Sequence, residues 1–272
     1  EIEQPAGFVL DDTIYPVTIG ADGQVVEIEI VNEYVRGNIH LTKVDSEYPD
    51  NKLTGATFEV YKDSNANGKL DDSDELLGTL TEKEIGEYGM NDLFYGRYFV
   101  KETKAPEGFV LDTGVYEVMI DTNGKTYEVE NKAGVGFVND AMRGNLKIVK
   151  TSSDGKVKGF AFRITGANGY DIILETNDKG EIFIDGLRIG DYTISEVSNS
   201  ASSMYVLPAD KKATVKLGST TIVEMHNVLR DTPKTGDTTN LPLLYALAGL
   251  SAVGIAVCGV IGFKKKKKED RN

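Results

Sequence analysis

Lysine, glutamate and asparagine residues recur at the ends of alternating apolar runs, where side chains of one parity share a face of a strand. In NIHLTK, Lys43 has the parity of Ile39 and Leu41, and NLKIVK repeats this pattern up to Lys150. The polar residues that end such runs form two sets, Lys43, Glu102 and Asn139 in the first and Lys150, Glu196 and Asn227 in the second. We therefore expect each set to face the interior of its own folded unit.

These three residue types can react when they are buried together. Burial lowers the pKa of a lysine and raises the pKa of a glutamate, which favours a neutral amine beside a protonated acid. The amine can attack the asparagine carboxamide while the acid shuttles protons, so that ammonia leaves and an amide joins the two side chains. The alternative is a hydrogen-bonded buried triad without chemistry. The recurrence of the pattern favours the reaction.

The strands that would position these residues belong to a long internal repeat. ETKAPEGFVLDTGVYEV matches EIEQPAGFVLDDTIYPV at the start of the chain, and VNDAMRGNLKIVK matches VNEYVRGNIHLTK. The matches predict three units, at residues 1–36, 37–143 and 144–231. Glu1 aligns with Glu102 and Asn32 also ends an alternating run, so we expect residues 1–36 to be the C-terminal part of a truncated unit. Such a short piece cannot bury a core by itself.

The composition indicates an all-β chain and excludes several classes of function. The 272 residues include 29 glycines and many Val, Ile and Thr runs, as expected for tandem β-sandwiches with tight turns. The net charge of −13 argues against nucleic-acid binding, which needs a basic surface. The single cysteine, Cys258, cannot form a disulfide within the chain, and the two histidines suggest no metal motif. No conventional catalytic set is present, so we predict a protein that is not an enzyme and has no resident cofactor.

The C-terminal end predicts a membrane span. Residues 241–263 carry no charge and are long enough to cross a bilayer as one C-terminal transmembrane helix. Five lysines follow directly, within the basic tail 264–272, so the positive-inside rule places the tail in the cytoplasm and the preceding chain outside. An exported chain of this kind needs a signal peptide, and residue 1 is Glu rather than Met, so we expect the sequence to be a fragment.

The acidic segment DSNANGKLDDSDE, residues 63–75, interrupts the first full unit and has the spacing of a calcium loop. Oxygen ligands would come from positions 1, 3, 5, 7, 9 and 12 of an EF-hand-like pattern, with the backbone carbonyl at position 7. These positions are Asp63, Asn65, Asn67, Lys69, Asp71 and Asp74. The alternative is an acidic hairpin with an Asn-Gly turn. Both interpretations remain open from the sequence.

Several stretches resemble the CnaB-type domains of Gram-positive surface proteins, which are also called SpaA-like or prealbumin-like. The resemblance rests on KVD, LTGATFEVY and YFVKETKAPEGF, the last of which resembles the E-box of pilins, and it covers roughly residues 1–231. It implies Ig-like or prealbumin-like β-sandwiches with spontaneous Lys–Asn isopeptide bonds promoted by Glu102 and Glu196, Glu1 being the equivalent residue of the truncated unit. The second full unit departs from the pattern, because VSNSASSMYVLP lacks the Ala-Pro-x-Gly turn.

The sequence TPKTG at residues 232–236, followed by a linker to residue 240, resembles the cell-wall sorting signal of sortase substrates. The resemblance implies cleavage between Thr235 and Gly236, and transfer of Thr235 to a peptidoglycan or pilin amine. Thr232 stands where the usual motif has leucine, which leaves the sortase class open. The motif comprises Thr232, Pro233, Lys234, Thr235 and Gly236.

Together these features predict a cell-wall-anchored, adhesion-related stalk at the cell surface, exposed to host or extracellular-matrix ligands. One alternative is a sortase-polymerised pilin subunit, although YPDN at residues 48–51 lacks the lysine of a pilin motif. Another alternative is the anchored stalk of a surface enzyme whose catalytic domain lies upstream.

Overall fold

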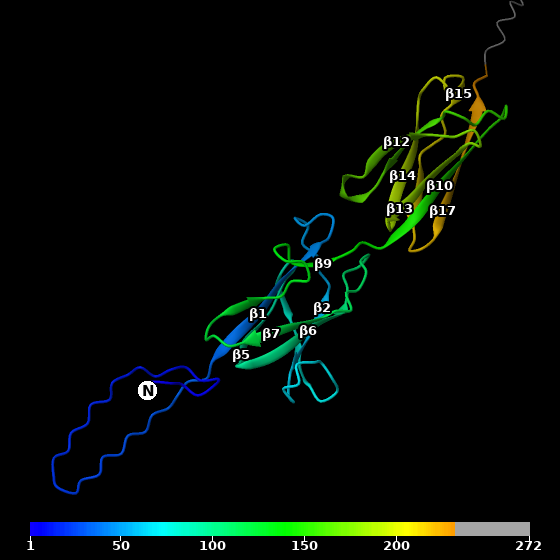
Figure 1. The fold of residues 1–272 in the computed structure, drawn as a ribbon. Coiled ribbons are helices and arrows are strands. Elements are labelled where there is room, and N and C mark those ends of the chain that lie inside the picture. Colours follow the sequence, from blue (N-terminus) through cyan, green and yellow to red (C-terminus); the bar gives the residue numbers. More distant parts are fainter. Residues whose placement is uncertain (232–272) are drawn as a thin grey trace, which may run out of the picture. The chain divides into compact units, whose positions relative to one another are not determined.

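The computed structural model describes residues 1–231, which contain two tandem β-sandwiches (Figure 1). The first module contains nine strands, β1 (Arg36–Asp45), β2 (Thr57–Lys62), β3 (Glu75–Thr79), β4 (Thr81–Glu84), β5 (Glu87–Phe94), β6 (Gly96–Lys104), β7 (Val115–Ile120), β8 (Thr126–Glu128) and β9 (Phe137–Asn139). The second contains eight strands and a short 3-10 helix, β10 (Arg143–Ser152), β11 (Ala161–Thr165), η1 (Ala167–Gly169), β12 (Asp171–Glu175), β13 (Glu181–Arg188), β14 (Gly190–Val197), β15 (Tyr205–Val206), β16 (Lys211–Val215) and β17 (Thr220–Leu229). The all-β prediction is therefore confirmed for this part of the chain.

Each module packs two sheets against each other. In the first module one sheet has the order β4-β5-β1-β8, with β9 also paired to β1, and the other has the order β3-β2-β6-β7. In the second module the orders are β13-β10-β17-β15 and β12-β11-β14-β16. In both modules the opening strand pairs in parallel with the closing strand, β1 with β9 and β10 with β17. The first and last strands of a module are therefore neighbours.

Alternating burial along the strands builds the core. Strand β1 alternates between half-buried and buried positions over most of its length, as a strand with one face on the core should. Phe58, Phe137 and Tyr88 form edge-to-face aromatic contacts at the centre of the first module. The remaining buried residues of this core include Ile39, Leu41, Val60, Tyr98, Val100 and Ile120.

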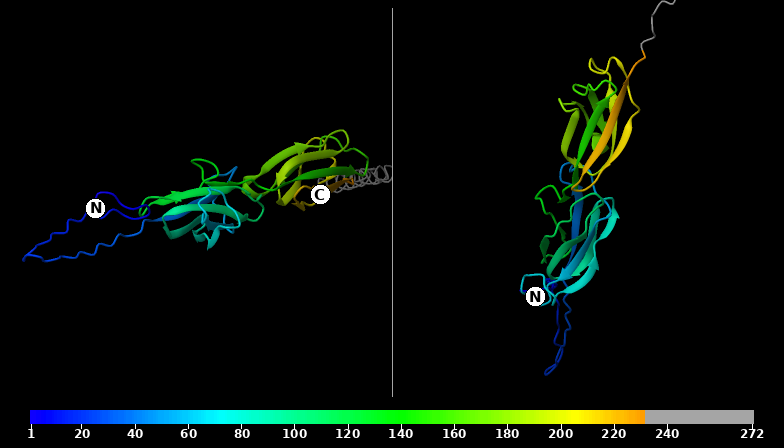
Figure 2. Two further views of the ribbon diagram at one scale, coloured as in Figure 1. Left: turned by 60° about the horizontal axis from the view of Figure 1, so that its bottom comes forward. Right: turned by 90° about the vertical axis from the view of Figure 1, so that its right-hand side faces the viewer.

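Residues 1–35 precede the first strand, β1, and extend as an arm (Figures 1 and 2). A bridge between Phe8 and Tyr34 joins the two halves of the arm, and Val9 donates a backbone hydrogen bond to Glu33 at 2.8 Å. Ile14, Val25 and many other aliphatic residues of the arm are exposed. The segment buries no core of its own, in agreement with its length.

Candidate functional site

The first module places Lys43, Glu102 and Asn139 in its interior. Lys43 lies on β1 and Asn139 on β9, and in the parallel register Lys43 is opposite Phe137 while Asp45 is opposite Asn139. Lys43 and Asn139 therefore share one face, two positions apart. Glu102 comes from β6 in the other sheet. The exposed fractions of Lys43, Glu102 and Asn139 are 0%, 1% and 2%.

The polar atoms of this set are only partly satisfied. The amide nitrogen of Asn139 donates to Oε2 of Glu102 at 2.8 Å and to the carbonyl of Val110 at 2.5 Å. Lys43 Nζ donates to the carbonyl of Phe137 at 3.0 Å. Within residues 1–231, Glu102 Oε1 and Asn139 Oδ1 are buried without a hydrogen-bond partner. A buried oxygen without a hydrogen-bond partner lowers the stability of the fold. Protonation of the Glu102 carboxyl or a reaction at the Asn139 amide would relieve this cost.

The second module repeats this arrangement. Lys150 on β10 pairs in register with Met225 of β17, and Asn227 follows two residues later on the same face. Glu196 on β14 accepts a hydrogen bond from the Asn227 amide nitrogen at 2.6 Å. All three polar side chains are buried, and Glu196 Oε2 and Asn227 Oδ1 join the unpartnered buried atoms of the described chain. The geometry of the second module does not depend on the Ala-Pro-x-Gly turn that its sequence lacks.

Burial shifts the protonation equilibria in the direction that amide formation needs. Desolvation lowers the pKa of Lys43 from 10.5 to about 8, although the charges of Glu102, Asp112 and Asp45 partly oppose this shift. Desolvation also raises the pKa of Glu102, against the hydrogen bond from Asn139. Both shifts act toward a neutral amine and a protonated acid.

In the second module the same cause acts on the same residue types. Desolvation lowers the pKa of Lys150 and raises that of Glu196. Lys150 Nζ lies 4.1 Å from the centre of the Phe160 ring, and Lys43 Nζ lies 5.5 Å from the centre of the Phe137 ring. These rings place each amine beside an apolar wall that keeps water away.

A glycine fixes the backbone of each lysine from the neighbouring turn. Lys43 donates its backbone N–H to Gly86 at 2.7 Å, and Lys150 donates to Gly180 at 2.7 Å. Both glycines have a positive φ, +72° and +77°, and a Cβ on either would lie 2.9 or 2.8 Å from the lysine carbonyl oxygen. Only glycine allows this approach without strain. The turns therefore fix the strand ends that carry the amines.

Residues 1–36 contain a third acid–amide pair without an amine. The Asn32 amide nitrogen donates to both carboxyl oxygens of Glu1 at 2.9 Å, and the repeat matches these two residues to Asn139 and Glu102. Glu1 is exposed and Asn32 is only half-buried, and residues 1–36 contain no lysine. This pair cannot form the cross-link by itself.

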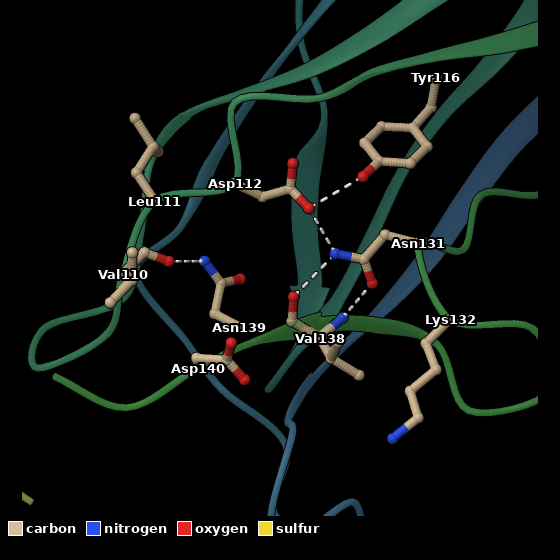
Figure 3. Close-up of a pocket in the computed structure, with 9 residues that line it drawn as sticks. All are labelled: Val110, Leu111, Asp112, Tyr116, Asn131, Lys132, Val138, Asn139 and Asp140. Carbon is tan, nitrogen blue, oxygen red and sulfur yellow. Dashed lines mark hydrogen bonds between the residues drawn. The ribbon is translucent and has the colours of Figure 1, made fainter. Parts of the chain in front are cut away.

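The structure adds three residues that the sequence interpretation missed. Asp112 donates its backbone N–H to Glu102 Oε2 at 2.8 Å, and its carboxylate accepts hydrogen bonds from Tyr116 and Asn131 (Figure 3). They line a pocket of about 420 Å³ that also reaches Asn139. A signal was present, because the spacing Glu-x9-Asp-x3-Tyr occurs at both residues 1–15 and residues 102–116.

The predicted calcium loop connects β2 to β3 and forms a network of its own hydrogen bonds. Asn67 donates its side-chain nitrogen to Asp71 at 2.6 Å, and Asp63 accepts the backbone N–H groups of Asn67 and Gly68 at 3.2 and 3.0 Å. Within residues 1–231, no group of three or more His, Cys, Asp or Glu side chains is placed to hold a metal ion. Asn65 also turns its amide nitrogen toward Asp71, at 3.2 Å, so the two asparagines would need to rotate to offer oxygen to a cation. Calcium binding stays a prediction.

The predicted sorting motif 232–236, membrane helix 241–263 and basic tail 264–272 lie outside the described residues. In the part of the chain that the structure describes, no helix is long and apolar enough to cross a membrane.

Comparison with known domains identifies the family. The SpaA prealbumin-like fold domain matches residues 37–133 and 144–228, which together make up more than half of the chain. The chain therefore belongs to the SpaA prealbumin-like domain family and contains two tandem copies of the domain. This confirms the resemblance that the sequence motifs carry.

Individual proteins also show similarity to this chain. The trypsin-resistant surface T6 protein of Streptococcus pyogenes serotype M6 is 28% identical over 184 residues, covering 66% of this chain and 30% of its own length. The Bacillus anthracis TIE protein has a TM-score of 0.61 at 25% identity, over 84% of this chain and 40% of its own. The minor pilin GBS52 of Streptococcus agalactiae has a TM-score of 0.34 at 19% identity, over 74% of this chain and 99% of its own. This chain thus spans less than half the length of the first two relatives.

Proposed function

We propose that this chain is a structural stalk of a Gram-positive cell-surface protein, in which each SpaA module closes itself with an amide bond between lysine and asparagine side chains. The observation that carries the proposal is the burial of a Lys, Glu and Asn set in both modules, with unpartnered oxygens on the acid and the amide. Membership of the family and similarity to a streptococcal surface protein support the location.

The geometry of the first module supports the following reaction. Neutral Lys43 attacks Cγ of Asn139, and a 180° rotation of the Asn139 amide brings its Oδ1 to the Glu102 carboxyl. The protonated acid donates a hydrogen bond to this oxygen as negative charge develops. It then passes its proton to the leaving nitrogen and takes up the proton that Nζ loses, so the acid ends in its starting form. A C–N bond forms between Nζ and Cγ, the original C–N bond breaks, and ammonia leaves. The second module would react in the same way with Lys150, Glu196 and Asn227.

The mass of residues 1–231 tests this reaction. The folded chain should lack the mass of two ammonia molecules, and Glu102→Ala should reduce the deficit to one, because the second module keeps its own acid. Lys43→Ala should have the same effect, and peptide mapping should find the remaining bond between Lys150 and Asn227. A chain with its full calculated mass would refute the proposal.

The C-terminal order of motif, apolar span and lysines supports anchoring by a sortase to a cell-wall or pilin amine. Deletion of residues 232–236 should move the protein from the cell-wall fraction to the membrane fraction of a Gram-positive host. Continued covalent attachment of the deletion variant to the wall would refute this anchoring route.

A further inference from the structure

The two modules hold their reactive acids differently. In the first module Glu102 Oε2 accepts two hydrogen bonds, from Asn139 at 2.8 Å and from the backbone N–H of Asp112 at 2.8 Å. In the second module Glu196 Oε1 accepts the bond from Asn227, and Oε2 is buried without a partner among the described residues. Each carboxyl is therefore held through one oxygen, but that oxygen accepts two hydrogen bonds in Glu102 and one in Glu196.

Asp112 is itself fixed by a local network (Figure 3). Its carboxylate accepts the backbone N–H of Gly114 at 2.6 Å, the hydroxyl of Tyr116 at 2.8 Å and the amide nitrogen of Asn131 at 2.6 Å. The Asn131 side chain also accepts a hydrogen bond from the Val138 backbone N–H at 2.6 Å and donates one to the Val138 carbonyl at 2.8 Å. Val138 directly precedes Asn139, so the network connects the loop that holds the acid to the strand that carries the amide.

The same hydrogen-bonded arrangement of Glu, Asp, Tyr and Asn occurs a second time in this chain. In residues 1–36, Asp11 donates its backbone N–H to Glu1 Oε2 at 3.0 Å, Tyr15 donates to Asp11 at 2.5 Å, and Asn32 donates to Glu1. The spacing Glu-x9-Asp-x3-Tyr is identical at both places. It is missing after Glu196, where the corresponding positions are occupied by Val206 and Asp210. This arrangement therefore accompanies Glu1 and Glu102 but not Glu196. The two full modules can thus be compared with and without it.

We propose that Asp112 is a positioning residue for the first module's cross-link. Its N–H donates to Oε2 of Glu102, the same oxygen that faces the Asn139 amide, and so restricts the rotation of the acid beside the reacting group. Its carboxylate, anchored by Tyr116 and Asn131, holds this N–H in place. The Lys43–Asn139 bond should therefore form faster than the Lys150–Asn227 bond, because the acid needs less reorganisation before it acts. This inference rests on the proposed amide formation.

The negative charge of Asp112 predicts a second measurable effect, on the pH dependence of cross-linking. Its negative charge raises the pKa of both Lys43 and Glu102. Asp112→Asn removes this charge, so both pKa values should fall and the pH dependence of cross-linking in the first module should move toward lower pH. A purely structural substitution would slow the reaction without moving its pH dependence.

The test is a refolding time course of the full chain, started from unfolded, uncross-linked protein and quenched with acid. Peptide mass mapping follows the two bonds separately. In the unmodified chain the Lys43–Asn139 bond should form first. Asp112→Ala should slow it by about tenfold or more, while the rate of the Lys150–Asn227 bond should stay unchanged. Asp121→Ala is the matched control, since Asp121 also accepts a tyrosine hydroxyl, from Tyr127 at 2.6 Å, but does not contact Glu102.

The outcomes separate this inference from the proposed function. If the unmodified chain loses no ammonia, amide formation itself is wrong. If both bonds form, but the first is not the faster or Asp112→Ala leaves it unaffected, only the role of Asp112 is refuted. Should Asp112→Ala prevent folding of the first module, Asp112→Asn decides, because an unshifted pH dependence would refute the role of its charge.

Discussion

At the scale of single residues, the most informative feature is the burial of Lys43 and Lys150 away from solvent. A charged lysine in an apolar interior costs several kcal/mol unless its charge is paired or removed. Lys43 has one hydrogen-bond acceptor, the Phe137 carbonyl, for its three possible donors. Conversion of this amine to an amide would remove the charge permanently. The burial that makes the free lysine costly is therefore the same burial that makes it reactive.

The pH dependence of stability tests this cost in a chain that cannot react. In Glu102→Ala the Lys43 amine stays free, and loss of the Glu102 charge should hold its folded pKa at or below about 8. Because the unfolded lysine titrates near 10.5, the unfolded state binds more protons between these values. Unfolding free energy should therefore rise with pH from about 8 to 10.5, by at most about 1.4 kcal/mol per pH unit.

Urea unfolding of the first module, followed by circular dichroism, measures this rise. The control is Glu102→Ala combined with Lys43→Met, which should lack it. Equal slopes in the two variants would mean that Lys43 is not buried as a free amine.

At the scale of elements, the turn before β5 packs against β1 and holds the backbone of Lys43 in place. Gly86 lets the turn approach the backbone of Lys43, and Gly180 does the same for Lys150 in the other module. The parallel pairing of first and last strands then brings the lysine and the asparagine to one face. The reactive set thus depends on backbone geometry that no single side chain supplies.

Gly86→Ala should destabilise the first module and lower the fraction of Lys43–Asn139 bonds. The alanine would have an unfavourable positive φ and would also press on the Lys43 carbonyl oxygen, at 2.9 Å. The control is Gly124→Ala, which has the same φ of about +73° but nothing within 4 Å. Gly124→Ala should cost about 1–2 kcal/mol from its conformation alone, and Gly86→Ala should cost more. Thermal melting and intact mass measure both effects, and equal losses would refute the steric argument.

The loop between β2 and β3 has a separate prediction. If residues 63–75 bind calcium, its addition should raise the melting temperature of the folded chain and a chelator should reverse the rise. Asp71→Asn should abolish this response, whereas Asp92→Asn, at an exposed position elsewhere in the module, should retain it. A melting temperature that calcium and chelator leave unchanged would support the acidic hairpin instead.

At the scale of the whole chain, two closed modules follow one another. The chain enters the first module near Lys43 and leaves it near Asn139, and the second module has the same order from Lys150 to Asn227. A bond between these residues would transmit tension without loading the strands between them. It would also restrict the unfolded state of nearly a whole module.

Force spectroscopy on the tethered chain tests this property. The unmodified chain should show no extension from unfolding of the segment between Lys43 and Asn139. Glu102→Ala should release these 96 positions, which extend by up to roughly 330 Å at about 3.4 Å per residue. Glu196→Ala should release the segment of the second module only. Release of the first segment in the unmodified chain would show that its cross-link is absent.

The sequence alone determined the strand content, the repeat, and the parity that places Lys43, Glu102 and Asn139 on inward faces, because alternation and internal matches are local in the chain. It also pointed to the family through its motifs. Only the tertiary structure decided that β1 and β9 are parallel neighbours and that Glu102 comes from the opposite sheet. It also decided that the backbone N–H of Asp112 donates a hydrogen bond to Glu102. These facts depend on which strands pair and on how the two sheets face each other. Pairing between strands as distant in sequence as Lys43 and Phe137 leaves little trace in the local sequence.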